Sequence, residues 1–169
     1  YLLGRNLSAK VSYTKMNQYI HLLSNSYISQ PTDIWVPVTG NIRPMHAHQV
    51  TGGLFWHYKE LDFSAEGYYK RMNNLVEYKD NGPVLPSFEG WEDRVGGGKG
   101  RSYGLELMVQ KKTGRFNGWI GYTLSWSDRW FPDGTVNKGH RFPSKYDNRH
   151  KVDIVASYKL SRKVELTAA

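Results

Sequence analysis

Two histidines, His46 and His48, are the first residues whose spacing suits chemistry. Residues two positions apart on a strand lie on the same face, so both imidazoles would be presented together as metal ligands. The chain has no cysteine, and no carboxylate pair stands beside the histidines to complete a ligand set. We therefore interpret them as polar residues at the loop end of a strand, and we expect no metal or other cofactor.

Asp147, Arg149 and His150 form a second group, which combines the acid, the cation and the imidazole that hydrolytic sites use. Catalysis would also need an activated nucleophile, and no G-x-S-x-G segment is present to supply one. A salt bridge or hydrogen-bond network at the edge of a loop explains this group better. The sequence therefore indicates that the protein is not an enzyme.

The segment Gly96-Gly97-Gly98-Lys99-Gly100-Arg101-Ser102 looks like a phosphate-binding loop. In such a loop the lysine is followed by serine or threonine, and a helix comes next. Here Gly100 follows Lys99, and the residues beyond alternate as a strand does. We interpret the glycines as a flexible hairpin loop that closes onto this strand.

The chain of 169 residues is basic, with a formal net charge of +8, and 14% of its residues are aromatic. Basic and aromatic side chains together can bind nucleic acid, but no focused patch is present, so we expect no nucleic-acid partner. Six cations lie in or beside the last long connection. They could contact lipopolysaccharide phosphates, bind an anionic ligand or simply be solvated: Arg129, Lys138, Arg141, Lys145, Arg149 and Lys151.

Period-two alternation of apolar and polar residues predicts seven strands, at 7–14, 50–58, 61–70, 102–110, 120–126, 151–160 and 164–169. Long connections at 21–46, 79–100 and 128–148 alternate with tight corners at 59–60, 113–115 and 161–163. Long loops at one end of a sheet and short turns at the other are typical of an outer-membrane barrel. The sequence therefore predicts an all-β fold, an antiparallel transmembrane β-barrel segment of about seven strands, with no helix longer than about three turns.

The two faces of these strands are predicted to meet different surroundings. A hydrated lumen would accommodate the charges of the polar face, while the apolar face meets hydrocarbon and the ladder pairs the backbone. The residues expected to face lipid are Leu7, Val11, Leu54, Phe63, Leu105, Leu107, Ile120, Leu124, Val152 and Ile154. A soluble sheet with one solvated face shows the same alternation. The positions of the aromatic residues must therefore distinguish a membrane barrel from a soluble sheet. Two belts are expected, with Tyr58, Phe63, Phe116 and Tyr158 at the turn side and Tyr19, Tyr78, Tyr103 and Trp126 at the loop side.

Several segments together resemble the barrel of TonB-dependent receptors, in particular the Bacteroidetes type that carries a carboxypeptidase-like regulatory domain. These segments are PTDIWVP (31–37) with PMHAHQV (44–50), GKGRSYGLE (98–106), TGRFNGWIGYTLS (113–125), and DNRHKV (147–152) leading into YKLS (158–161). Each segment alone is only weakly specific for this family. Their occurrence in this order along nearly the whole chain is more specific.

The resemblance implies a barrel of about 22 strands, to which residues 1–169 contribute a part. The sequence contains no plug or N-terminal domains, so we expect the chain to be a piece of a larger receptor. Such receptors lie in the bacterial outer membrane and take up a scarce ligand, such as a metal chelate, vitamin, glycan or peptide, into the periplasm. The implied partners are membrane lipid and lipopolysaccharide, the rest of the barrel and its plug, the inner-membrane TonB complex acting through that plug, and a surface lipoprotein. The alternative is a pore or structural barrel without a plug.

The predicted outer loops at 79–100 and 128–148 carry aromatic and cationic residues that suit ligand contact: Trp91, Arg94, Arg129, Trp130 and Phe131. Aromatic faces bind sugars and aromatic chelates, and guanidinium groups bind anions. Ordinary packing of the loops is the competing interpretation.

Overall fold

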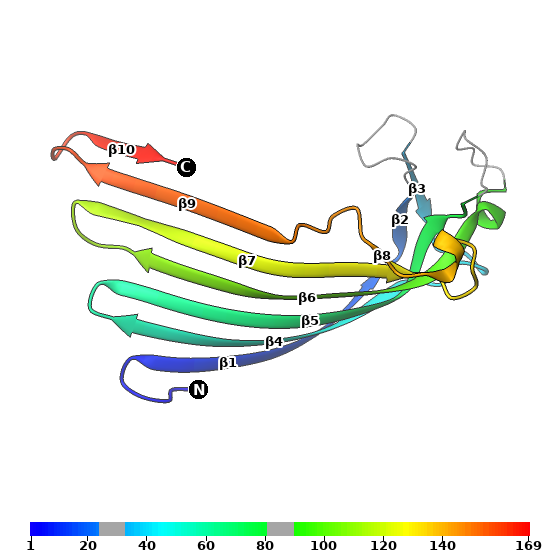
Figure 1. Ribbon diagram of the computed structural model, residues 1–169, viewed down its shortest axis with the longest axis horizontal. Coiled ribbons are helices and arrows are strands. Elements are labelled where there is room, and N and C mark those ends of the chain that lie inside the picture. The colour runs from blue at the N-terminus through cyan, green and yellow to red at the C-terminus, as the bar shows by residue number, and fades with distance from the viewer. Residues whose placement is uncertain (24–32, 81–89) are drawn as a thin grey trace.

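The computed structural model describes residues 1–23, 33–80 and 90–169, which form an antiparallel all-β fold (Figure 1). The main sheet is built from β1 (Leu7–Gln18), β4 (Met45–Tyr58), β5 (Leu61–Tyr78), β6 (Val95–Lys111), β7 (Phe116–Trp130), β9 (His150–Lys159) and β10 (Glu165–Ala168), and the short β8 (Phe142–Pro143) pairs with β7. The strand order is β1-β4-β5-β6-β7-β9-β10, and the described residues leave the sheet open. The predicted antiparallel barrel segment is therefore confirmed.

The two ends of the sheet differ as the connection lengths predicted. The hairpins β4–β5, β6–β7 and β9–β10 close at one end of the curved sheet, and the remaining short elements gather at the other (Figure 1). The β4–β5 hairpin turns at Lys59 and Glu60, and Lys59 adopts a φ of 56°, as tight hairpin turns require. Parts of the long connections at 21–46 and 79–100 lie outside the described residues.

The interpretation of Gly96, Gly98 and Gly100 as a flexible loop is wrong, because all three lie inside β6. A Cβ on Gly98 would come within 2.5 Å of the Phe131 ring, and one on Gly100 within 2.8 Å of Leu75. The glycines are therefore needed where side chains from the connection after β7 and from β5 press against β6. Without side chains of their own, they gave no alternation from which a strand could be predicted.

Two small hydrophobic clusters hold the loop end together. One contains Leu23 from β2 (Ile20–Leu23), Val36 from β3 (Ile34–Pro37), Trp91 from the 3₁₀ turn η1 (Trp91–Arg94), and Val95. The other contains Leu75, Phe131 and Val136, just before the 3₁₀ turn η2 (Asn137–Gly139). The β2–β3 hairpin is a separate two-stranded sheet that the sequence did not predict. Neither helical turn of the described residues is long and apolar enough to cross a membrane.

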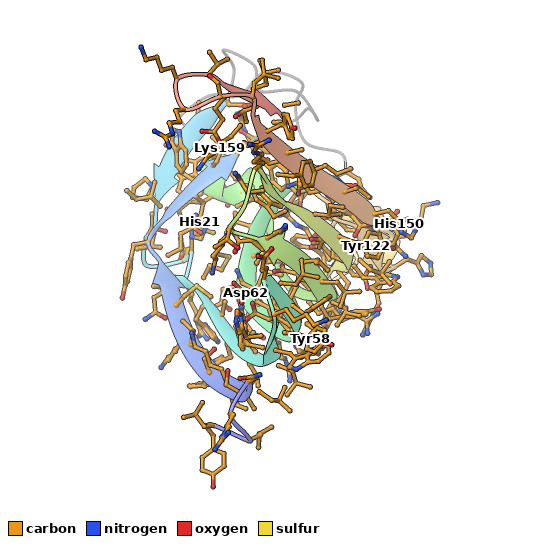
Figure 2. All side chains as sticks on the ribbon, turned by 90° about the vertical axis from the view of Figure 1, so that its left-hand side faces the viewer. His21, Tyr58, Asp62, Tyr122, His150 and Lys159 are labelled. Carbon is orange, nitrogen blue, oxygen red and sulfur yellow. The ribbon has the colours of Figure 1, made fainter. Side chains whose placement is uncertain are left out.

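The predicted lipid-facing residues do not converge on a core. Seven of the ten are exposed large hydrophobics: Val11, Leu54, Leu105, Leu107, Ile120, Val152 and Ile154. Leu7, Phe63 and Leu124 are half-buried, and none of the ten is buried. Figure 2 views the sheet from its turn end as an open arc, with Tyr122 and His150 on its outer side and Asp62 toward its inner side. An apolar outer face and a polar inner face are what a barrel wall in lipid requires.

Aromatic residues mark both edges of the apolar outer face. On the loop side, Tyr103 stacks on Tyr69 and on Trp126, with ring centroids 6.4 Å and 5.3 Å apart, to form a belt over three strands. On the turn side, Trp56 and Phe63 stack at 5.3 Å. Tyr78 ends β5 on the loop side, as predicted, but it does not join the belt. It lies beyond an irregularity between Asn73 and Leu75 and packs against the Trp91 cluster.

Candidate functional site

A pocket of about 310 Å³ opens on the inner face of the sheet at its loop end. Its floor is the apolar inner side of β4 and β5, with Met45, Met72 and Leu75. Charged and aromatic residues complete the wall. They come from β3, from the loop ends of β5 and β7, and from the connection after β8: Trp35, Glu77, Arg129, Lys145 and Tyr146. Apolar surface combined with a few polar groups at fixed positions is typical of small-molecule sites.

The polar part of this wall centres on Arg129. Its Nη1 donates to Oε2 of Glu77 at 2.9 Å, which ties the end of β7 to the end of β5 across β6. Both side chains are about three-quarters buried, so water screens the pair less than it would at an open surface. The ion pair holds the guanidinium in place at the edge of the pocket while part of it stays accessible.

Two aromatic side chains on the pocket wall are largely exposed. Trp35 is 62% exposed and Tyr146 is 68% exposed. The Nζ of Lys145 lies 5.1 Å from the centre of the Tyr146 ring, within the range of a cation–π contact. Exposed aromatic faces beside cations are suited to sugars, aromatic chelates and anions.

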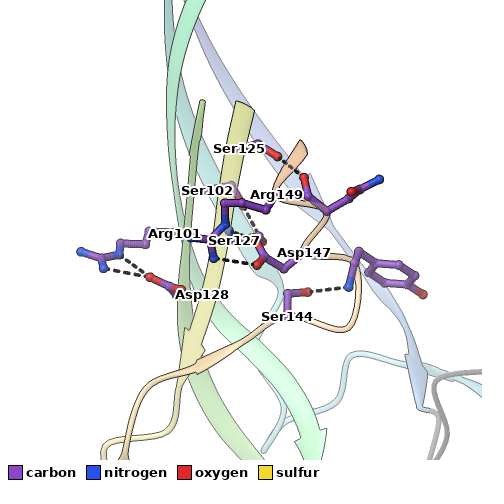
Figure 3. A network of polar contacts seen from close by, with 10 residues as sticks. Arg101, Ser102, Ser125, Ser127, Asp128, Ser144, Asp147 and Arg149 are labelled. Carbon is purple, nitrogen blue, oxygen red and sulfur yellow. Dashed lines mark hydrogen bonds and ion pairs between the residues drawn. The ribbon is translucent and has the colours of Figure 1, made fainter. Parts of the chain in front are cut away.

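A network of hydrogen bonds anchors the segment that carries Lys145 and Tyr146 (Figure 3). Oδ1 of Asp147 accepts from the backbone N–H of Ser127 at 2.7 Å, and its Oδ2 accepts from Arg149 at 3.0 Å. The backbone N–H of Ser144 donates to the Ser127 carbonyl at 2.7 Å, and Ser125 donates to the Asn148 carbonyl at 3.0 Å. The expected loop-edge network around Asp147 and Arg149 is confirmed.

His150 does not join that network. Its Nδ1 lies 2.8 Å from the Tyr122 hydroxyl on the outer face of the sheet. At the other side of the sheet, Nδ1 of His48 lies 2.6 Å from the Tyr13 hydroxyl, and its ring meets His46 edge-on with centroids 5.9 Å apart. His48 and His150 therefore each pair with a tyrosine on the outer face of the sheet.

The five residues predicted to contact ligand lie in different surroundings. Trp91 and Phe131 are 9% and 0% exposed and belong to the two separate hydrophobic clusters. Arg94 ends η1 and is half-buried. Trp130 lies opposite Lys99 on the outer face, and the guanidinium of Arg141 lies 4.4 Å from the centre of the Trp130 ring. Arg129 alone among them lines the inner pocket. Ligand contact by this set stays a prediction.

Sequence reasoning missed Trp35 and Tyr146 as pocket residues, and it named Lys145 only as one of six cations that could meet an anion. Trp35 lies on β3, whose pairing with β2 has only four residues on each side, too short for a periodicity argument. Tyr146 follows Lys145 in a connection without regular structure, and only the aromatic and cationic composition there gave a signal.

Comparison with known families agrees with this structure. Residues 1–168 match the family described as TonB dependent receptor-like, beta-barrel. No curated protein and no solved structure matches the chain. Barrels of this family lie in the bacterial outer membrane and serve receptors that transport rather than catalyse. A sheet with an apolar outer face, two aromatic edges, tight turns at one end and long connections at the other belongs in such a wall, and this chain is a member of the TonB-dependent receptor β-barrel family.

Proposed function

We propose that this chain forms part of the wall of a receptor that imports a scarce ligand, and that the inner pocket beside Arg129 lies on the ligand's path. The observation that carries the proposal is the placement of the pocket. Its floor lies on the inner face of β4 and β5 near their loop ends, where a ligand entering from outside would first meet the barrel.

The lining of the pocket favours a ligand with both apolar or ring surface and negative charge. Trp35 and Tyr146 offer ring faces, while Arg129 and Lys145 offer cations beside them. A metal chelate, a vitamin, a glycan or a peptide can each present such a surface. Among these classes, the chemistry favours anionic chelates and acidic sugars.

The loops at 79–100 and 128–148 are proposed to face outside the cell and to make the first contacts. Within them, Arg94, Arg129 and Trp130 keep part of their side chains accessible, and the buried Trp91 and Phe131 support the loop conformation. Trp91 and Phe131 would then act on the ligand indirectly, by fixing the backbone that carries its neighbours.

The remaining parts of the mechanism follow from family membership. A plug folded inside the completed barrel would block the lumen, and the inner-membrane TonB complex would pull on that plug to admit the ligand to the periplasm. The resemblance to the Bacteroidetes type adds a surface lipoprotein as a partner that delivers ligand to the outer loops.

Uptake measurements in cells test the proposal. Cells with and without the intact receptor would be given a labelled ferric chelate, cobalamin, an acidic oligosaccharide and a peptide. We expect uptake of one of the four to need both the receptor and TonB. Uptake that needs the receptor but continues without TonB would instead support the pore without a plug.

The pocket itself is tested with the compound that this panel identifies. Trp35→Ala/Tyr146→Ala should reduce uptake at least several-fold, while Trp35→Phe/Tyr146→Phe keeps the ring faces and should retain most of it. Normal heat-dependent migration on gels would establish that both variants assemble. Unchanged uptake by the alanine variant would remove this pocket from the ligand path.

A further inference from the structure

The connection between β8 and β9 leaves the main sheet for a short distance. The ladder along β7 pairs Pro143 with Asp128 and resumes where His150 pairs with Leu124. Between these two pairs, three residues of β7 lie beside six residues of the connection, 144–149. Regular antiparallel pairing would match them one to one, so the extra residues of the connection must turn away from the strand.

Ser127 holds the base of this excursion with both of its backbone polar groups. Its carbonyl accepts from the Ser144 N–H at 2.7 Å, and in a regular ladder its own N–H would donate back to the Ser144 carbonyl. Here the Ser144 carbonyl accepts from the Asp147 N–H at 2.8 Å, and the Ser127 N–H donates to Oδ1 of Asp147 at 2.7 Å. The Asp147 carboxylate therefore takes the place of a backbone carbonyl in the sheet (Figure 3).

The excursion begins with a tight turn from Ser144 to Asp147. Besides the bond that closes the turn, the N–H of Tyr146 donates to Oγ of Ser144 at 3.4 Å. Lys145 and Tyr146 occupy the two central positions of the turn, and both line the inner pocket. The base of the turn is sheltered, since Ser144 is 7% exposed and the Asp147 side chain 10%, whereas Tyr146 at the tip is largely exposed.

The second oxygen of the Asp147 carboxylate is bound by Arg149. Nη2 of Arg149 donates to Oδ2 at 3.0 Å, and the guanidinium carbon lies 5.0 Å from the centre of the Trp126 ring. Asp147 thus joins the turn to β7 through one oxygen and to the aromatic belt through the other. Hydrogen bonds to a charged acceptor are stronger than neutral ones, so this sheltered carboxylate is a firm anchor.

We propose that Asp147 is a positioning residue of the ligand site, because its carboxylate fixes the turn that presents Lys145 and Tyr146 to the ligand. The inference rests on the proposed function of the inner pocket. A turn that is ordered before the ligand arrives loses little conformational freedom on binding, so the anchor raises affinity. Asp147 lies at the base of the turn, outside the pocket wall. Its effect should therefore appear in the half-saturating concentration of uptake and not in the maximal rate.

Matched substitutions separate the parts of this arrangement. Asp147→Ala removes both contacts of the carboxylate, whereas Asp147→Asn keeps an oxygen that can accept from the Ser127 N–H and gives up the charge that pairs with Arg149. Asp133→Ala is the control. Asp133 lies in the same connection and its Oδ1 also accepts from a backbone N–H, that of Thr135 at 3.1 Å, but it stands outside the pocket wall. Normal heat-dependent migration on gels would establish that the variants assemble.

The position of the turn is measured without any ligand, by pulsed electron spin resonance on the intact receptor with labels at positions 145 and 113. Position 113 lies in the exposed turn between β6 and β7. Asp147→Ala should broaden the distribution of distances, because the turn loses its anchor, while Asp147→Asn and Asp133→Ala should keep it as narrow as in the wild type. An equally narrow distribution in Asp147→Ala, or an equally broad one in Asp147→Asn, would overturn the proposal.

A further variant decides the matter if Asp147→Ala fails to assemble. Asp147→Glu keeps the charge but sets the carboxylate one methylene farther from the backbone. It should shift the distance between the two labels, because the turn can no longer seat on Ser127 in the same way. An unchanged distance would overturn the proposal.

Uptake kinetics test the link to the ligand, with whichever compound of the panel the receptor imports: the ferric chelate, cobalamin, the acidic oligosaccharide or the peptide. Asp147→Ala should raise the half-saturating concentration roughly tenfold, as the loss of a hydrogen bond to a charged group does, and leave the maximal rate unchanged. A lower maximal rate at an unchanged half-saturating concentration would show a role in assembly alone and would overturn the proposal.

The same assay separates this inference from the proposed function. If Trp35→Ala/Tyr146→Ala leaves uptake unchanged, the proposed function of the pocket fails. If that variant reduces uptake while Asp147→Ala leaves the half-saturating concentration as it was, the positioning role of Asp147 alone is overturned.

Discussion

The ring of Phe131 lies against Gly98 on the inner face of the sheet, so closely that a Cβ on Gly98 would stand 2.5 to 2.7 Å from three ring carbons. This contact joins the first residue after β7 to the middle of the glycine run in β6. It places the start of the 128–148 connection over the inner face, which positions the segment that later carries Lys145 and Tyr146.

Gly98→Ala should therefore destabilise the barrel by about 1–3 kcal/mol, as overpacking does in a filled core. Gly97→Ala is the matched control, because a Cβ there meets nothing within 4 Å. The free energy of unfolding in urea, measured in lipid vesicles, compares the two variants. Equal stability of both would show that the Phe131 contact does not constrain β6.

A charge on the outer face should be costly where the same charge on the inner face is not. Leu107→Arg would place a cation near the middle of the apolar band, and we expect a loss of about 2–4 kcal/mol of unfolding free energy. Met108→Arg, one position along β6, faces the lumen and should cost much less. Equal losses for the two variants would contradict the assignment of faces.

The Arg129–Glu77 ion pair should couple the ends of β7 and β5. A double-mutant cycle with Arg129→Gln and Glu77→Gln isolates this interaction from the other effects of each substitution. We expect a favourable coupling of about 1 kcal/mol, above that of most open surface pairs because the two groups are largely buried. A coupling near zero would mean that the pair does not hold the pocket wall.

The β2–β3 hairpin should loosen in mild acid. His21 is 5% exposed, its Nε2 has no hydrogen-bond partner among the described residues, and burial lowers its pKa from 6.5. The neutral form is therefore favoured in the fold, and the stability it gives is complete above pH 6.5 and lost as pH falls through the lowered pKa.

Hydrogen exchange of the amides in β2 and β3, corrected for intrinsic rates, would follow this change between pH 7.5 and pH 5. The variant His21→Phe cannot be protonated and should show no such dependence. Faster exchange in acid that persists in His21→Phe would assign the effect to another group.

The sequence predicted the regular part of this wall and failed where side chains from elsewhere decide the conformation. Alternation located β1, β4, β5, β6, β7, β9 and β10, because a strand with one face in lipid must repeat every two residues. The glycines of β6 were misassigned because their role depends on Phe131, more than 30 positions away. The exposure of Trp35 and Tyr146 similarly depends on how the loop segments pack on the sheet, which no local pattern encodes.

The central claim is that the apolar face of this sheet meets lipid and the polar face meets the lumen. The described sheet agrees in scale, since Phe116 and Trp126 stand ten positions apart on β7, about 34 Å of strand or about 25 Å of membrane at the usual tilt. The chain has no cysteine of its own, so single spin labels can be placed along β6.

The most direct measurement labels each position from 104 to 109 in the intact receptor in vesicles and records its collision rates with oxygen and with a water-soluble nickel complex. Labels at positions 105, 107 and 109 should collide often with oxygen and rarely with the nickel complex. Labels at 104, 106 and 108 should show the opposite preference or low collision rates with both. Equal access at all six positions, or the reverse alternation, would contradict the account.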